Sequence, residues 1–172
     1  MSKAKAKVVE VVEVVEVVEP VIEKGHGEFL LADNSKYVGE WIVNNGIKYR
    51  NGKGVLHMGP EVYDGEWLND AMHGVGEYKF STGAKYKGDF KNNMFDGEGT
   101  YFFPDGRDHI NIEWLQALIT TALLGSRYSG SWSGNKMHGA GTYKGSDDVV
   151  LQGEFFNGTY RSGDKCVIVR TQ

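Results

Sequence analysis

The sequence predicts an all-β protein built as an elongated, single-layer antiparallel sheet of tandem β-hairpins. Three observations support this class: an internal period of 23 residues, glycine pairs at a fixed distance after an aromatic residue, and a high content of both residue types. The chain of 172 residues contains 24 glycines, 9 tyrosines, 8 phenylalanines and 4 tryptophans, but 3 prolines. A unit of this size cannot bury its apolar face alone, so successive units stack on one another.

The period is clearest from Tyr63 onward. Tyr63-Asp-Gly-Glu-Trp67 is followed after six residues by Gly74-Val-Gly-Glu-Tyr78, and the pattern restarts at Tyr86 and at Tyr128. Because alternate residues of a strand face the same side, each unit is a hairpin with aromatic residues and glycines on one face and charged residues on the other. Glycine has no Cβ, so we expect rings of adjacent strands to lie over bare backbone.

Partial units extend the array, which we expect to cover residues 24–160. Gly25-His-Gly-Glu-Phe29 matches the second half of a unit, and Leu151-Gln-Gly-Glu-Phe155 matches the first half with leucine in place of tyrosine. The unit that begins at Tyr37 reaches its glycine pair four residues late, so we expect residues 44–52 to form a lengthened loop. Asn157-Gly158 has the composition of a hairpin turn. Residues 161–172 are expected to be a capping strand or a tail.

Two segments depart from the repeat. Residues 1–23 form a low-complexity tail in which Val-Val-Glu occurs four times. This tail is either a charged lead-in without fixed structure, or an arm that docks on a partner or on the open edge of the array. Residues 107–125 are a surplus whose apolar residues recur at helical spacing, which predicts a short helical insertion. The insertion either covers the aromatic face, binds a partner or is mobile, and an unremoved intron would leave the same pattern.

Composition and motifs disfavour several classes of function. The formal net charge of −4 lacks the basic character that nucleic-acid binding requires, and the longest apolar run is too short to cross a bilayer. The glycine pairs are explained by hairpin geometry, not by a nucleotide-binding loop. His73 and His138 occupy equivalent places in separate hairpins, too far apart to share a metal ion. We therefore expect no catalytic site, no cofactor and no metal.

The pattern Tyr-x-Gly-x-Trp/Phe, followed by Gly-x-Gly-x-Tyr at a 23-residue spacing, resembles the MORN repeat. Residues 63–80, 86–103 and 128–143 match closely, and the partial units match in part. Short chains made only of such repeats are similar to the small MORN proteins of cilia, flagella and sperm. The resemblance implies a non-enzymatic structural scaffold or adaptor in the cytoplasm and cytoskeleton, within a ciliary or flagellar axoneme, at an assembly such as a radial spoke or the central apparatus.

The predicted partner-binding surface is the aromatic face of the sheet. We expect it to be exposed, because the sequence contains no second layer long enough to cover it, and exposed apolar surface marks interaction sites. It would hold a helix or an extended segment of a partner protein, such as another axonemal subunit. Its residues are Tyr37, Trp41, Tyr63, Trp67, Tyr78, Tyr86, Phe90, Tyr101, Tyr128, Trp132 and Tyr143.

Two other hypotheses compete with the scaffold. The first is a peripheral membrane adaptor, since MORN repeats of some related proteins are linked to phosphoinositides, and Lys85, Lys87 and Lys91 gather around one hairpin. Each lysine contributes about 1 kcal/mol near an anionic membrane surface, but Asp89 lies among them, which favours a solvated face. The second is an enzyme, disfavoured because too few residues follow Phe155 to form a catalytic domain.

Overall fold

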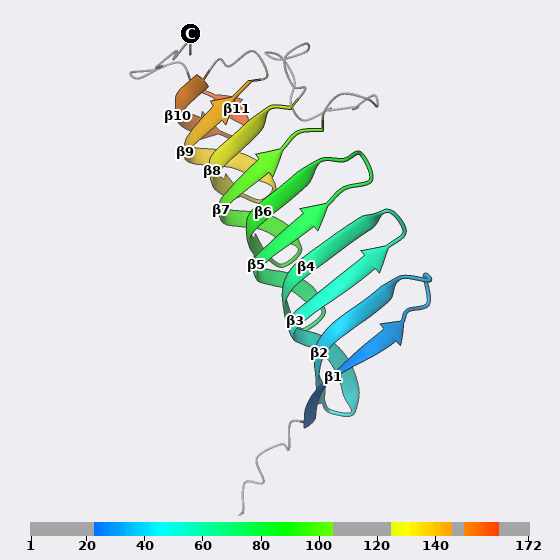
Figure 1. Cartoon of the computed structure of the whole chain (residues 1–172). Helices are drawn as coiled ribbons and strands as arrows, with labels where there is room; N and C mark the ends of the chain where they lie inside the picture. Colours follow the sequence, from blue (N-terminus) through cyan, green and yellow to red (C-terminus); the bar gives the residue numbers. More distant parts are fainter. Residues whose placement is uncertain (1–22, 105–124, 146–149, 162–172) are drawn as a thin grey trace, which may run out of the picture.

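A computed structural model of the protein describes residues 23–104, 125–145 and 150–161. In these residues the chain forms one open antiparallel sheet of 11 strands, and the order of the strands in the sheet is their order in the sequence (Figure 1). This confirms the predicted class, a single sheet of successive hairpins. The helical insertion predicted at 107–125, the Val-Val-Glu tail and the predicted C-terminal capping strand lie almost wholly outside the described residues.

The array is elongated, with β1 at one end and β10 and β11 at the other (Figure 1). The strands are β1 (Glu23–Leu30), β2 (Lys36–Asn44), β3 (Ile47–Met58), β4 (Glu61–Leu68), β5 (Ala71–Lys79), β6 (Lys85–Lys91), β7 (Met94–Phe102), β8 (Arg127–Ser133), β9 (Lys136–Lys144), β10 (Val150–Phe156) and β11 (Thr159–Tyr160).

Five hairpins close through two-residue turns in which both residues have positive φ. These turns are Asn45-Gly46, Asn69-Asp70, Asn92-Asn93, Gly134-Asn135 and Asn157-Gly158. This is the type I′ geometry, whose twist matches that of the flanking strands and which asparagine, aspartate and glycine adopt most easily. The turn predicted at Asn157-Gly158 is confirmed. The lengthened loop predicted at 44–52 is wrong, because the Asn45-Gly46 turn closes early and the extra residues lengthen β3 to 12 residues.

The second residue of a turn also binds the preceding hairpin. The backbone N–H of Asn93 donates to the carbonyl oxygen of Met72 at 3.0 Å, and Oδ1 of Asn93 accepts from the N–H of Met72 at 2.8 Å. The same two bonds join Asp70 to Arg50 and Asn135 to Phe95. At the last turn, Gly158 binds the carbonyl of Met137 through its backbone but has no side chain to complete the pair.

One glycine in each of β1 to β10 lies in register with the next across the sheet. These glycines, called the glycine row, are Gly27, Gly39, Gly54, Gly65, Gly76, Gly88, Gly99, Gly130, Gly141 and Gly153. Tyrosine rings fill the space above this row. A Cβ at Gly76 would lie 2.7 Å from the ring of Tyr63, and one at Gly141 would lie 2.5 Å from the ring of Tyr128. Rings therefore lie over bare backbone, as predicted.

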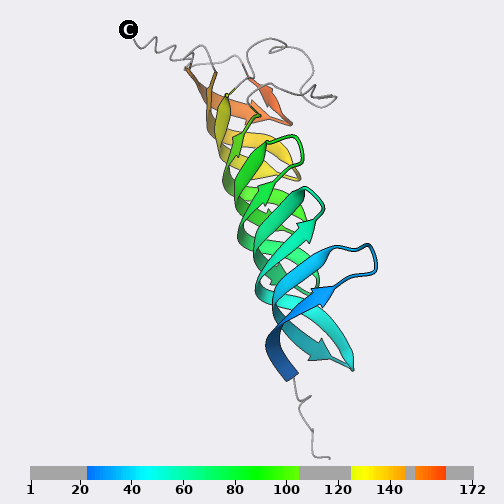
Figure 2. The same cartoon turned by 45° about the vertical axis from the view of Figure 1, so that its right-hand side comes forward.

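From the second Gly-x-Gly pair onward, the first glycine of the pair bends its hairpin. Gly74 has a φ of 59° and Gly97 a φ of 114°, and the register of the paired strands shifts beside each of them. A carboxylate of the opposite strand stabilises the bulge, since Asp89 accepts the backbone N–H of Glu98 at 2.8 Å. Bulges bend and twist strands, and the strands of this sheet curl round in the same sense (Figure 2). The concave face is called the trough below.

Candidate partner-binding site

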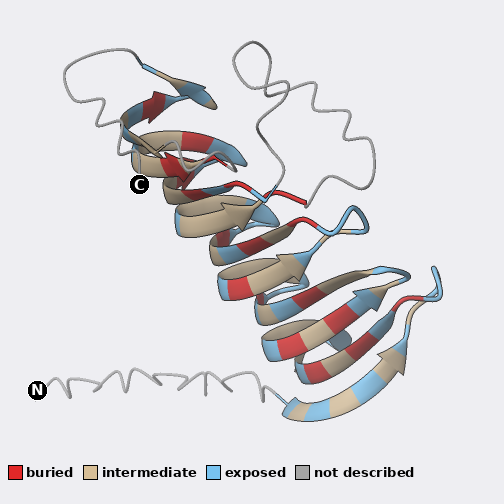
Figure 3. Ribbon diagram, turned by 45° about the horizontal axis from the view of Figure 1, so that its top comes forward, coloured by how far each residue is buried: buried red, intermediate tan, exposed pale blue. Residues whose placement is uncertain are grey.

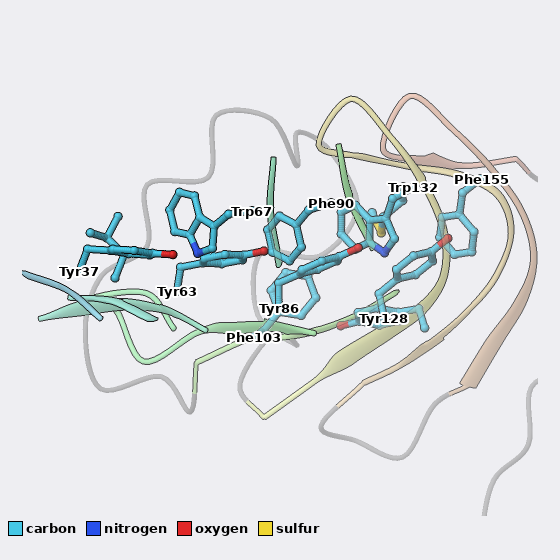
Figure 4. Packing of buried hydrophobic residues seen from close by; sticks show 12 residues of the cluster. Tyr37, Tyr63, Trp67, Tyr86, Phe90, Phe103, Tyr128, Trp132 and Phe155 are labelled. Carbon is cyan, nitrogen blue, oxygen red and sulfur yellow. The ribbon is translucent and has the colours of Figure 1, made fainter. Parts of the chain in front are cut away.

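Rings from the two sides of the trough interleave along the array to form a ladder. Tyr63 meets Trp67 edge-on, with ring centroids 5.1 Å apart, and meets Phe90 of the next repeat at 5.0 Å. The ladder continues through Tyr86, Trp132, Tyr128 and Phe155 (Figure 4). Edge-to-face pairs contribute about 0.5–1.5 kcal/mol each beyond the burial of their area. The ladder is therefore a main source of cohesion between repeats.

This ladder corrects the prediction of an exposed aromatic face. Eight of the eleven predicted residues are at most 5% exposed, namely Tyr37, Tyr63, Trp67, Tyr86, Phe90, Tyr128, Trp132 and Tyr143. Buried residues recur along the successive strands (Figure 3). Because the strands bend at their bulges, the rings of one face close over each other, and the single sheet makes its own core. These eight side chains stabilise the array and offer little surface to a partner.

Hydrogen bonds fix the buried rings in place. The hydroxyl of Tyr63 donates to the carbonyl of Glu66 at 2.8 Å, and that of Tyr86 to the carbonyl of Asp89 at 2.9 Å. Nε1 of Trp67 donates to the carbonyl of Gly54 at 3.0 Å. Burial raises the pKa of both tyrosines above its usual value. Their hydroxyls stay protonated and satisfied, which suits a structural role.

Four of the side chains that the trough presents form a half-buried band over β5 to β7. This central band consists of Tyr78, Phe80, Phe95 and Tyr101, all partly buried and packed against the core. Phe80 joins its members, with ring centroids 4.6 Å from Tyr78, 5.8 Å from Tyr101 and 6.3 Å from Phe95. Tyr78 is held further by Glu61, whose carboxylate accepts its hydroxyl at 2.6 Å. Two predicted residues, Tyr78 and Tyr101, thus belong to the accessible part of the trough.

Trp41, the remaining predicted residue, lies in a hollow of about 340 Å³ at the first repeat. The hollow is lined by Phe29, Leu30, Leu31, Tyr37, Trp41, Lys48, Tyr49, Arg50 and Asp70. Nζ of Lys48 lies 3.7 Å from the centroid of the Trp41 ring. The guanidinium of Arg50 lies 4.2 Å from the ring of Trp67 and pairs with Asp70 at 3.0 Å. The hollow thus combines apolar and aromatic walls with two cations.

Sequence analysis missed Lys48 and Arg50 as site residues. Both follow the Asn45-Gly46 turn on alternate positions of β3, where they pair with Val43 and Trp41 of β2. Recognising Asn-Gly as a two-residue turn would have placed both cations on the same face as Trp41. The prediction of a loop at residues 44–52 conceals this signal, because a loop has no fixed alternation of faces.

The three candidate lysines lie on β6 but do not form one compact cluster. Lys85 and Lys87 are neighbours on the outer face, and Nζ of Lys85 lies 4.9 Å from the ring of Phe102. Lys91 is four residues beyond Lys87, about 13 Å along a strand, and Asp89 lies between them. A membrane role for these lysines stays a prediction.

The described residues also bear on two other kinds of site. No helix there is long and apolar enough to cross a membrane. In the same part of the chain, no three or more His, Cys, Asp or Glu side chains are grouped so as to hold a metal ion. The accessible part of the trough is therefore the best-defined candidate site.

Comparison with known proteins identifies the repeat. Residues 63–85, 86–106 and 128–149 match the family model of the MORN repeat. The chain is also similar to Alsin of Rattus norvegicus, Mus musculus and Homo sapiens, with 44% identity over 43 residues, which is 25% of this chain and 3% of each Alsin. It thus spans a small fraction of those relatives. Because each matched segment begins at the ladder tyrosine of a hairpin in the curled sheet, these three segments are MORN repeats.

Proposed function

We propose that the protein is a non-enzymatic scaffold or adaptor whose trough binds segments of partner proteins. MORN repeats often serve as scaffolds that bind proteins or membrane lipids. The observation that carries the proposal is the central band, an accessible aromatic surface on a fixed core. Aromatic side chains held rigid before binding lose little conformational entropy when a partner arrives, so they make good anchors for a helix or an extended segment.

We further propose that the partners are subunits of a ciliary or flagellar axoneme, at an assembly such as a radial spoke or the central apparatus. Support for this location is the resemblance to small MORN proteins of cilia, flagella and sperm. Fluorescent tagging in ciliated cells tests it directly. A tagged chain that is absent from the axoneme would contradict the location and leave the binding role of the trough open.

Crosslinking mass spectrometry with matched variants tests the trough itself. Phe80→Ser and Phe95→Ser change the central band, whereas Val75→Ser changes a residue of β5 that is 56% exposed and belongs to the outer face. Circular dichroism would first establish that each variant is folded. We expect the two band variants to lose their partner crosslinks and the control to keep them. Equal crosslinking by all three would refute the trough as the binding surface.

A peripheral membrane adaptor is the second candidate, favoured by a row of outward-facing residues. Lys85 lies opposite Phe102, which lies opposite Arg127, which in turn lies opposite Lys144. Cations from three strands thus share one row. Flotation with vesicles that contain phosphatidylserine separates the two candidates. A membrane adaptor would float, and a variant with Lys85, Lys87 and Lys91 changed to glutamate would not, whereas a protein-binding scaffold would show no difference.

A further inference from the structure

Two tryptophans of the ladder each lie between two tyrosines. Trp67 meets Tyr63 of its own repeat at 5.1 Å and Tyr37 of the preceding repeat at 5.6 Å. Trp132 meets Tyr128 at 5.2 Å and Tyr86 at 5.4 Å in the same way. All four contacts are edge-on. In these two repeats, the space on each side of the tryptophan ring is therefore filled by a tyrosine ring.

Trp41 is the equivalent ring of the first repeat, and its slot differs. The preceding strand, β1, contributes no tyrosine, and the residues before it contain no aromatic side chain. Trp41 lies over β1 instead, since a Cβ at Gly25 would lie 2.6 Å from its ring. Among the described residues it makes no ring-to-ring contact of the ladder type. The space beside it is the hollow of about 340 Å³, which is larger than one aromatic ring.

The two cations that line the hollow differ in their pairing. Arg50 lies over Trp67 and pairs with the carboxylate of Asp70, which lines the hollow as well. Lys48 occupies the corresponding place over Trp41. Within the described part of the chain, however, Lys48 forms no ion pair. The acid that lines the hollow, Asp70, is thus paired with Arg50, and Lys48 has no carboxylate partner of its own among the described residues.

We propose that this hollow binds a single aromatic side chain of a partner protein, carried by an extended segment with an acidic residue next to it in sequence or one residue removed. The ring would pack edge-on against Trp41, as Tyr37 packs against Trp67 one repeat further on. Tyr37 would form another wall of the site, and the carboxylate would pair with Lys48. Leu30 at the rim is 75% exposed and offers apolar contact to the backbone of the segment. This proposal rests on the scaffold function and names the chemistry of its partner.

Titration of the full chain with short peptides, followed by nuclear magnetic resonance, tests the proposal. The probe is Gly-Ser-Tyr-Ser-Glu-Ser-Gly, compared with peptides in which alanine replaces the tyrosine or lysine replaces the glutamate. A ligand of this size binds with a dissociation constant on the order of 1 mM. We expect the shifts to centre on Trp41, Tyr37 and Lys48, and the alanine peptide not to bind.

A charge swap supplies the matched control. Lys48 is exposed, so Lys48→Glu leaves the core intact. We expect it to weaken the glutamate peptide up to about fivefold and to improve binding of the lysine peptide. Lys136→Glu, at the tip of another hairpin, should change neither affinity.

Several outcomes would overturn the proposal. Equal binding of the tyrosine and alanine peptides, or shifts that map elsewhere, would do so. Contacts between tail valine methyls and the Trp41 ring in the free protein would show that the hollow is filled by the chain's own tail. If the free protein is a dimer and Trp41→Leu makes it dissociate, a second copy of the chain occupies the hollow. If no peptide binds but Phe80→Ser abolishes the partner crosslinks, this proposal is refuted and the scaffold function remains supported.

Discussion

Replacing Gly99 with alanine tests whether the ladder depends on the glycine row. A Cβ at Gly99 would lie 2.3 Å from the hydroxyl oxygen of Tyr86 and 2.5 Å from Cζ. The backbone of Gly99 is not in the left-handed region, so alanine fits it and only the ring obstructs. The ring would have to move by roughly 1 Å to restore ordinary contact.

That movement disturbs everything the ring of Tyr86 contacts. It weakens the hydrogen bond to the carbonyl of Asp89 and the contacts with Phe90, Phe95 and Trp132. At about 1 kcal/mol for the bond and about 1 kcal/mol for each ring contact, we expect the free energy of unfolding to fall by about 3–5 kcal/mol. Urea denaturation followed by circular dichroism measures this change.

A second background isolates the clash. At position 151 the sequence itself has leucine in place of the ladder tyrosine, so Tyr86→Leu is a tolerable substitution. It removes the ring that covers Gly99. In that background we expect Gly99→Ala to change the free energy of unfolding by less than about 1 kcal/mol, because the methyl group meets no ring and alanine is better suited than glycine to a strand. An equal loss in both backgrounds would show that the cost lies in the backbone and would refute the packing account.

Three further predictions concern the bulge, the turns and the tyrosines. Asp89→Ala should lower the free energy of unfolding by about 1–3 kcal/mol, since the N–H of Glu98 loses its acceptor, while Asp89→Asn should retain most of it in the same urea assay. Gly46→Val should lower the melting temperature, because φ at Gly46 is 76° and a β-branched residue is strained there; an unchanged value would argue against the type I′ turn. Burial raises the pKa of Tyr37 and Tyr128 from 10.0 to about 12, so folding favours their protonated form. Stability should be complete below pH 10 and fall as the pH rises towards 12, and absorbance titration at the tyrosinate band should show these groups ionising late; full ionisation near pH 10 in the folded protein would contradict it.

The periodicity of the sequence was sufficient to predict the strand order. Successive units repeat the same aromatic and glycine positions. Pairing the two halves of one unit sets Gly65 opposite Gly76, and pairing that unit with the next sets Gly76 opposite Gly88. The placement of rings over glycines follows from the same alternation. Both are local consequences of a period-two pattern, which sequence reasoning handles well.

Curvature was not predicted, and the error about exposure follows from it. Treating both glycines of each pair as ordinary strand residues gives a twisted sheet that does not curl, so its aromatic face is open. Gly74 and Gly97 instead adopt positive φ, and the resulting bulges bring the two sides of that face together. The acidic residue after Tyr-x-Gly, Glu66 or Asp89, was the sequence signal for this bend, because its carboxylate lies against the first glycine. When this acidic residue is interpreted as a solvated charge, it gives no indication that the sheet is curved.

The bonds from the four later turns to the hairpin before each of them give the array a direction. Each of these bonds clamps a later unit onto an earlier one, and Asp70, Asn93 and Asn135 do so with backbone and side chain together. The last clamp, at Gly158, holds by its backbone alone. Under tension or thermal agitation, peeling should therefore begin at this final clamp and proceed backwards one unit at a time, so amide protons near Met137 should exchange with solvent sooner than those near Met72.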